Sequence, residues 1–187
     1  KYIVNDPTIN DDNERIKALH KMITSLPFDI EFTGYIRVDL IHKFREQREL
    51  LLEMGAKSLH FGIETFHPKC AKAIKKGLHP DKVKELLYYL RETWENKIVM
   101  GSGFVIGLPY ETKESVYETF KWLKDPDCPL DAASFVAMYI PKPSYKDIDY
   151  SDISKNPNEF DFEIKDYGWE SKEMTYDEAK EMTGKFS

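Results

Sequence analysis

The chain has 187 residues, 41% of them hydrophobic, so it can bury the core of one domain, or of one domain that carries an appendage. It contains no run of eighteen apolar residues and no signal-peptide pattern at its start, so we expect a soluble, cytoplasmic protein without a membrane partner. The net charge of −6 is concentrated in residues 147–187, which hold 12 acidic and 5 basic residues, and no basic stripe indicates nucleic-acid binding.

Short β-type segments alternate with helical segments along the first 140 residues, as they do in the βα units of a parallel sheet. The predicted strands are residues 1–5, 30–38, 58–64, 97–106 and 132–140. The predicted helices are one capped by residues 10–13 and ended by Pro27, one at 40–54 closed by Gly55, a short one opening at Pro68, one beginning at Pro80, and one capped by Thr112 and ended at 125–126.

Five strands in strict alternation with helices favour an α/β fold that forms part of a β/α barrel, with a doubly wound open sheet as the alternative. The chain begins with Lys and runs directly into a strand, so we interpret it as a fragment truncated upstream. We expect residues 1–143 to form the partial barrel.

From residue 141 the alternation stops, and residues 144–187 are expected to form an acidic C-terminal appendage. The appendage is rich in aromatic residues, so part of it should dock, with Tyr167 and Trp169 packing against the barrel. The spacing of Thr175 and Glu178 fits a capping box and predicts a terminal helix over residues 174–186.

Ligands bind at the C-terminal ends of the strands in such sheets and barrels, so polar residues there are candidates for a binding site. They are Asp6, Arg37, Asp39, Glu64, residues 107–111 and Tyr139. An arginine can bind a carboxylate through two hydrogen bonds, and a carboxylate can accept from ribose hydroxyls or an ammonium group. The alternative is a structural ion pair between Arg37 and Glu64 at the barrel rim.

The sequence predicts no metal ligands. The five histidines, which have no metal-ligand spacing, are interpreted as surface or capping residues: His20, His42, His60, His67 and His79. The two cysteines, Cys70 and Cys128, are far apart in the sequence and are expected to be reduced thiols.

Five pieces of sequence stand in a fixed order along residues 1–143. They are N-D-P-T-I-N from Asn5, G-Y-I-R-V-D from Gly34, M-G-A from Met54, F-G-I-E-T from Phe61 with I-K-K-G from Ile74, and G-F-V-I-G-L-P-Y-E-T from Gly103. In order and spacing these pieces resemble the radical S-adenosylmethionine (SAM) superfamily. The D-P-T and G-I-E-T pieces are most similar to the branch whose members often carry an upstream cobalamin-binding domain.

The resemblance implies a partial (β/α)6 TIM-like barrel of which this chain supplies strands two to six. In the family, a C-x-x-x-C-x-x-C loop after the first strand holds a 4Fe-4S cluster, and an electron from the cluster cleaves SAM to methionine and a 5'-deoxyadenosyl radical. The chain lacks that motif, so we expect it to be inactive alone. In the intact protein the implied cofactors are SAM and the cluster, with cobalamin as a candidate. The implied partners are an electron donor such as flavodoxin or ferredoxin and a small-molecule or peptide substrate.

The resemblance also implies roles for single residues. Asp6 corresponds to a group near the SAM amino end, Arg37 to one near the methionine part, and Glu64 to a ribose contact. Lys76 is the implied partner of the SAM carboxylate. The implied adenine contacts are Val105, Ile106 and Gly107 on one strand and residues 137–139, ending at Tyr139, on the next.

Two other functions remain open at this stage. The first is a non-catalytic binding or scaffold module that kept the barrel and lost the cluster, and the sequence immediately before Lys1 would distinguish it from an enzyme. The second is an unrelated β/α-barrel enzyme, which the absence of a His/Asp cluster disfavours.

Overall fold

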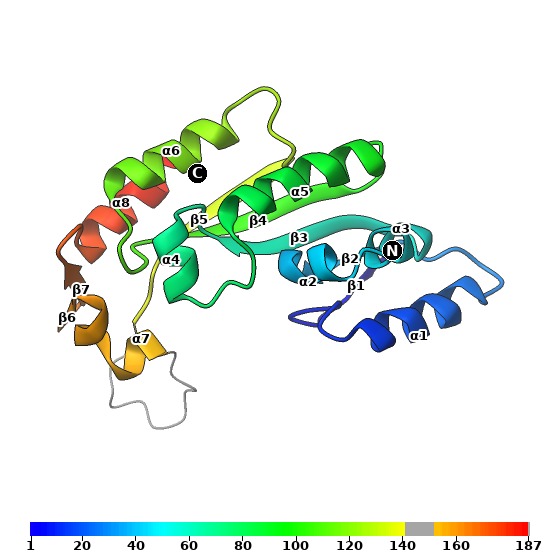
Figure 1. Cartoon of the computed structure of the whole chain (residues 1–187), viewed down its shortest axis with the longest axis horizontal. Helices are drawn as coiled ribbons and strands as arrows, with labels where there is room; N and C mark the ends of the chain where they lie inside the picture. Colours follow the sequence, from blue (N-terminus) through cyan, green and yellow to red (C-terminus); the bar gives the residue numbers. More distant parts are fainter. Residues whose placement is uncertain (141–151, 187) are drawn as a thin grey trace.

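The computed structural model describes residues 1–140 and 152–186, which are built around one five-stranded sheet (Figure 1). All neighbouring strands are parallel and follow one another in chain order, β1-β2-β3-β4-β5. A doubly wound sheet would reverse this order at a switch point, whereas a partial β/α barrel keeps it. The predicted barrel is therefore confirmed. Its strands are β1 Tyr2–Ile3, β2 Phe32–Ile36, β3 Ala56–Glu64, β4 Val99–Ile106 and β5 Ala132–Ala137.

Helices fill the connections between the strands, and α5 and α6 lie over one face of the sheet in Figure 1. They are α1 Asn13–Thr24, α2 Val38–Lys43, α3 Gln47–Glu53, α4 Pro68–Ala73, α5 Pro80–Thr93 and α6 Lys113–Leu123. Local signals set their ends as expected. Thr112 caps α6 through a reciprocal capping box with Ser115, Pro80 occupies the first turn of α5, and Gly55 follows α3 with a φ of +87°.

The single helix expected over residues 40–54 is wrong, because the chain forms two helices, α2 and α3, with a break between them. Gln47, at the start of α3, is fully buried. Its side chain accepts from Asn10 and donates to Asn13, over 3.0 and 3.1 Å. These long-range bonds fix the start of α3 independently of α2, and no local pattern encodes them.

The two faces of the sheet differ in their burial. Along β3, Leu59, Phe61 and Ile63 are buried in the helix-covered core, while the alternate positions, including His60 and Gly62, are only half-buried. The same alternation runs along β4. One face of the sheet therefore packs under the helices, and the other face is less covered and can meet a ligand.

The tail forms a small unit of its own elements: α7 Asp152–Lys155, a 3-10 turn at Pro157–Phe160, the antiparallel strands β6 Phe162–Lys165 and β7 Gly168–Ser171, and α8 Tyr176–Phe186. The predicted terminal helix is confirmed as α8, which packs against β4 and β5, and the Thr175–Glu178 capping box is present. The β6–β7 hairpin was not predicted. The expected domain boundary after residue 143 lies outside the described residues.

The two aromatic residues of the hairpin differ in their burial. Trp169 is buried, with 2% of its surface exposed, and it packs on the barrel as expected. The same expectation for Tyr167 is wrong, because its side chain is 93% exposed. Tyr167 lies in the two-residue connection between paired Lys165 and Gly168, where a side chain points away from both strands.

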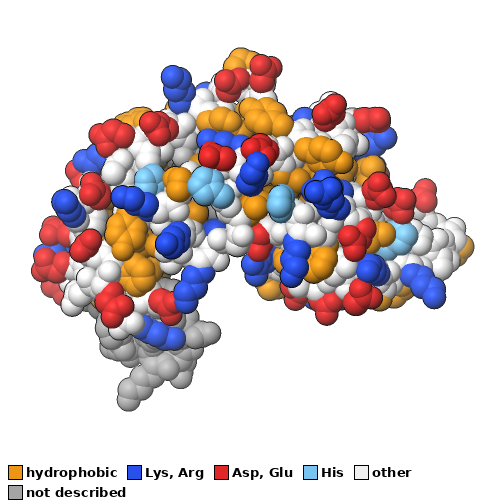
Figure 2. Space-filling model, viewed as in Figure 1, with side chains coloured by type: hydrophobic (Ala, Val, Ile, Leu, Met, Phe, Trp, Pro, Cys, Tyr) orange, Lys and Arg blue, Asp and Glu red, His pale blue; other side chains and the backbone are white. Residues whose placement is uncertain are grey.

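Acidic and basic side chains are interspersed across the face of the molecule shown in Figure 2. Within the described ranges, none of the helices has the length and apolar character needed to span a bilayer.

Candidate functional site

A cleft of about 470 Å³ opens at the carboxyl ends of β1, β2 and β3, the edge where ligands bind in β/α barrels. Its walls come from Pro7 and Thr8 after β1, from residues 35–39 at the end of β2, from His60 and residues 62–65 at the end of β3, and from residues 74–78 after α4. Four of the predicted site residues line it together: Arg37, Asp39, Glu64 and Lys76.

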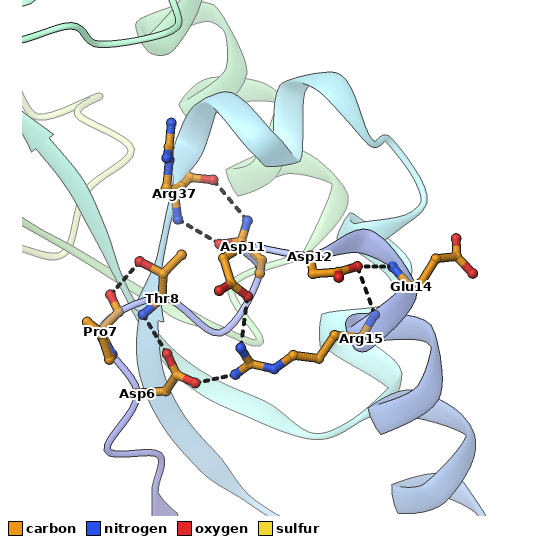
Figure 3. Close-up of polar contacts among 9 residues, drawn as sticks. Asp6, Pro7, Thr8, Asp11, Asp12, Glu14, Arg15 and Arg37 are labelled. Atoms are coloured by element: carbon orange, nitrogen blue, oxygen red, sulfur yellow. Dashed lines mark hydrogen bonds and ion pairs between the residues drawn. The ribbon is translucent and has the colours of Figure 1, made fainter.

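Asp6 organises the loop after β1 (Figure 3). Its carboxylate accepts from the Thr8 amide over 2.9 Å and forms an ion pair with Arg15, which also pairs with Asp11. The hydrogen bond from Thr8 and the Arg15 guanidinium hold the pKa of Asp6 below its usual value. Among the described residues, the lining of the cleft includes Pro7 and Thr8 but not Asp6. Asp6 therefore stabilises the loop that forms this wall.

Arg37 lies at the end of β2 with its backbone held by Asn10, a buried residue that the sequence indicated only as part of a helix cap. The Asn10 amide group donates to the Arg37 carbonyl over 3.0 Å and accepts from the Arg37 amide over 2.8 Å. In Figure 3 the Arg37 side chain points away from the Asp6–Arg15 pair. Its guanidinium makes two hydrogen bonds to Asp39, of 3.1 and 2.6 Å, and these bonds raise the pKa of Arg37.

Glu64 ends β3 with a left-handed backbone, at a φ of 62°. Its carboxylate forms an ion pair with Lys76, whose ammonium also donates to the carbonyl oxygen of Gly62 over 2.9 Å. The predicted alternative, a structural pair between Arg37 and Glu64, is wrong, because each residue has another partner.

The cleft thus contains two matched ion pairs, Arg37 with Asp39 and Glu64 with Lys76. A third cation of the lining, Lys75, pairs with Asp152, which lies outside the lining. A ligand that carries both an ammonium and a carboxylate can exchange partners with such pairs and leave no charge unmatched. Gly77 brings the backbone close, since a Cβ at this position would lie 2.6 Å from Oδ2 of Asp39. The arrangement suits a zwitterionic ligand.

The other four predicted contacts do not line this cleft. Val105 and Ile106 border a gap of about 10 Å³ that they share with Glu64. Gly107 has a φ of +92° and lies under the Trp169 indole, where an added Cβ would come within 2.2 Å of the ring. Tyr139, which is 69% exposed and follows β5, lines a separate cleft of about 520 Å³ beside the β6–β7 hairpin.

Glu111 supports the end of β4. It is buried and accepts from the amides of Gly107 and Leu108, over 2.8 and 3.4 Å, and from the Thr65 hydroxyl over 3.2 Å. Burial raises its pKa to about 7, although these hydrogen bonds oppose the shift. The sequence indicated Glu111 as a candidate ligand-binding residue at a strand end. In the structure its carboxylate binds the backbone amides of Gly107 and Leu108.

Cys70, His67 and His79 have structural roles. Cys70 is buried beside His67, with Sγ 3.0 Å from Nδ1, and burial raises the pKa of its thiol. His67 and His79 cap α4 and α5, as expected, whereas His60 lines the cleft. In residues 1–140 and 152–186, no group of three His, Cys, Asp or Glu side chains could hold a metal ion.

Comparison with known proteins relates this geometry to a family. The family model described as "Radical SAM superfamily" matches residues 3–123. An uncharacterized methyltransferase of Pyrococcus horikoshii is 27% identical over 130 residues, covering 70% of this chain and 27% of that protein. The chain spans about a quarter of the length of the first curated relatives it matches.

Two solved structures show the same fold at low identity. Coproporphyrinogen III oxidase (HemN) from Escherichia coli, a radical SAM enzyme, superposes with a TM-score of 0.55 at 17% identity, covering 92% of this chain and 36% of that chain. The cobalamin-dependent radical enzyme OxsB, with aqua-cobalamin and S-adenosylmethionine bound, gives a TM-score of 0.56 at 16% identity, covering 84% and 23%.

Proposed function

The chain belongs to the radical SAM superfamily, and from that premise we propose that its strand-end cleft binds S-adenosylmethionine in an enzyme that cleaves SAM reductively. The observation that supports this most is the pairing of two cations with two carboxylates in one cleft. The methionine part of SAM is a zwitterion, and its ribose offers hydroxyl donors. The residues present therefore fit the cofactor.

Each cleft residue has a proposed task. Lys76, which reaches the end of β3 from the connection after α4, binds the SAM carboxylate with its ammonium group. Arg37 binds the rest of the methionine part. Glu64 accepts from the ribose hydroxyls. The loop that Asp6 stabilises faces the amino end. When bound, SAM supplies the radical chemistry of the family, while these residues hold its polar groups in place.

The adenine contacts are proposed at the end of β4 and after β5. Val105 and Ile106 supply apolar surface next to Glu64, and Gly107 and Tyr139 supply backbone groups beyond them. The Glu111 carboxylate holds the amide of Gly107, so it fixes the shape of this segment.

The 4Fe-4S cluster that the family uses does not fit the residues of this chain. Three thiolates must converge on such a cluster, and the sequence has two cysteines, neither of which lines the cleft. We therefore assign these residues no part in any reaction step that uses the cluster. Cobalamin, an electron donor such as flavodoxin or ferredoxin, the substrate and a cytoplasmic location remain proposals for the whole protein.

Anaerobic reconstitution with iron and sulfide tests the cluster statement. We expect the purified chain to bind no stoichiometric iron and to develop no brown absorbance band, because only two thiols are present. Four irons per chain would contradict this expectation.

A second candidate function, which the sequence left open, is a non-catalytic binding or scaffold module that kept the barrel. Such a module has no need of SAM. Binding of SAM to the cleft therefore distinguishes the two functions.

Calorimetry on point variants tests the proposed SAM contacts. Glu64→Ala and Arg37→Ala are each expected to weaken SAM binding by about 10- to 150-fold, since a hydrogen bond to a charged group contributes about 1.5 to 3 kcal/mol. Glu53→Ala is the matched control, because the Glu53 side chain is 58% exposed and pairs with His20. Its SAM affinity should equal that of the wild type.

Circular dichroism should show the same fold in all three variants. Unchanged SAM affinity in both Glu64→Ala and Arg37→Ala would mean that the two ion pairs are only structural.

A further inference from the structure

The wall of the cleft formed by β2 and β3 carries an aromatic pair that the proposed SAM contacts leave unused. Tyr35 of β2 and His60 of β3 both line the cleft. Their rings meet edge to face, with centroids 5.0 Å apart and an interplanar angle of 61°. Tyr35 is 52% exposed, so its ring is accessible from the open side of the sheet.

Two glycines of β4 make room for the His60 ring. A Cβ at Gly103 would lie 3.3 Å from Nε2 of His60, and a Cβ at Gly101 would lie 3.6 Å from Nδ1. His60 is opposite Gly101 in the β3–β4 register. Gly103 is two residues further along β4, so both glycines lie on the less covered face of the sheet, as His60 does. The imidazole therefore lies against backbone that carries no side chain at these two positions.

The hydrogen-bonding groups of His60 are free in the part of the chain that the structure describes. Its only interactions there are the ring contact with Tyr35 and a long-range attraction to Glu64. Burial lowers the pKa of His60, so the ring is neutral near pH 7 and offers one donor and one acceptor. A half-buried imidazole with both nitrogens available beside the exposed ring of Tyr35 can bind the polar edge of a ring.

We propose that Tyr35 and His60 form a ring-binding subsite for the substrate, in which His60 positions a flat, unsaturated ring that has a hydrogen-bonding group at its edge. This inference rests on the proposed function, because the substrate is the molecule that lies next to SAM in the same cleft. Tyr35 supplies the stacking surface, and His60 supplies orientation.

Two small carboxamides test the subsite on the 187-residue chain. Benzamide and cyclohexanecarboxamide carry the same polar group on six-membered rings, but only the benzamide ring is flat. In NMR titrations of the isotope-labelled chain, benzamide should shift the His60 ring resonances and bind about two- to tenfold more tightly than its saturated counterpart.

Three variants make the test specific to His60. His60→Ala should remove the preference for benzamide. Gly103→Ala should weaken the preference, because its Cβ would press on Nε2, whereas Gly101→Ala, whose Cβ makes an ordinary contact, should retain it. Equal binding of both carboxamides to the wild type, or a preference that persists in both His60→Ala and Gly103→Ala, would overturn the proposal.

A titration with SAM separates this proposal from the one on which it rests. The wild-type chain is titrated with SAM beside the two carboxamides, because SAM binding is assigned to Arg37, Glu64 and Lys76, and the benzamide preference to Tyr35 and His60. If SAM fails to bind the wild type while benzamide shows the expected preference, the proposed function fails and the ring subsite stands.

Discussion

Replacing Trp169 by alanine is expected to lower the free energy of unfolding by about 3 to 5 kcal/mol. The indole is buried over Gly107, it meets Phe162 and Tyr176 edge to face, and its Nε1 donates to the carbonyl of Met138 over 2.8 Å. Truncation leaves a cavity and an unpaired backbone carbonyl between the hairpin and the ends of β4 and β5. Urea unfolding followed by circular dichroism measures the change.

Tyr167→Ala provides the matched control, because Tyr167 belongs to the same hairpin and is 93% exposed. Its effect should stay within about 0.5 kcal/mol. Equal stability losses in the two variants would show that the hairpin does not depend on Trp169 for its docking.

The second large effect is a pH dependence that originates in Glu111. Its pKa is about 7 in the folded chain, against the usual 4.5. A carboxyl group whose pKa is raised by folding contributes its full stability below the unfolded value, and the contribution is lost as the pH rises through the folded value. The wild type should therefore lose about 3 kcal/mol of stability between pH 4.5 and pH 8 through this group.

Glu111→Gln isolates that contribution. The amide keeps an acceptor for the Gly107 backbone and does not titrate, so the difference in unfolding free energy between wild type and variant should shift in favour of the variant as the pH rises. Chemical unfolding at half-unit pH intervals measures it. Parallel pH profiles of the two proteins would contradict the raised pKa.

Local sequence signals predicted most of the barrel. Strand and helix order, the Thr112 cap, the turn after α3 at Gly55 and the terminal helix depend on residues close in sequence, and the structure confirms them. The break between α2 and α3 could not be predicted, because Gln47 is held by residues more than 30 positions earlier.

The sequence also indicated which predicted site residues lie close together. Parallel strands bring their ends to one edge, so Arg37 and Glu64 were expected to be neighbours, and both line the cleft. The ion pair between Glu64 and Lys76 could not be inferred, because Lys76 lies in the connection after α4 and its position depends on how that loop folds. The position of Tyr167 depended on hairpin geometry that its aromatic character does not reveal.

The most direct test of the central claim is an amide NMR titration of the chain with SAM. If the cleft binds SAM, the resonances of Thr8, Arg37, Gly62, Glu64 and Gly77 should shift together, and these shifts should diminish in Glu64→Ala. Shifts confined to the neighbourhood of Tyr139 and Tyr167, or no shifts at all, would contradict the assignment of this cleft to SAM.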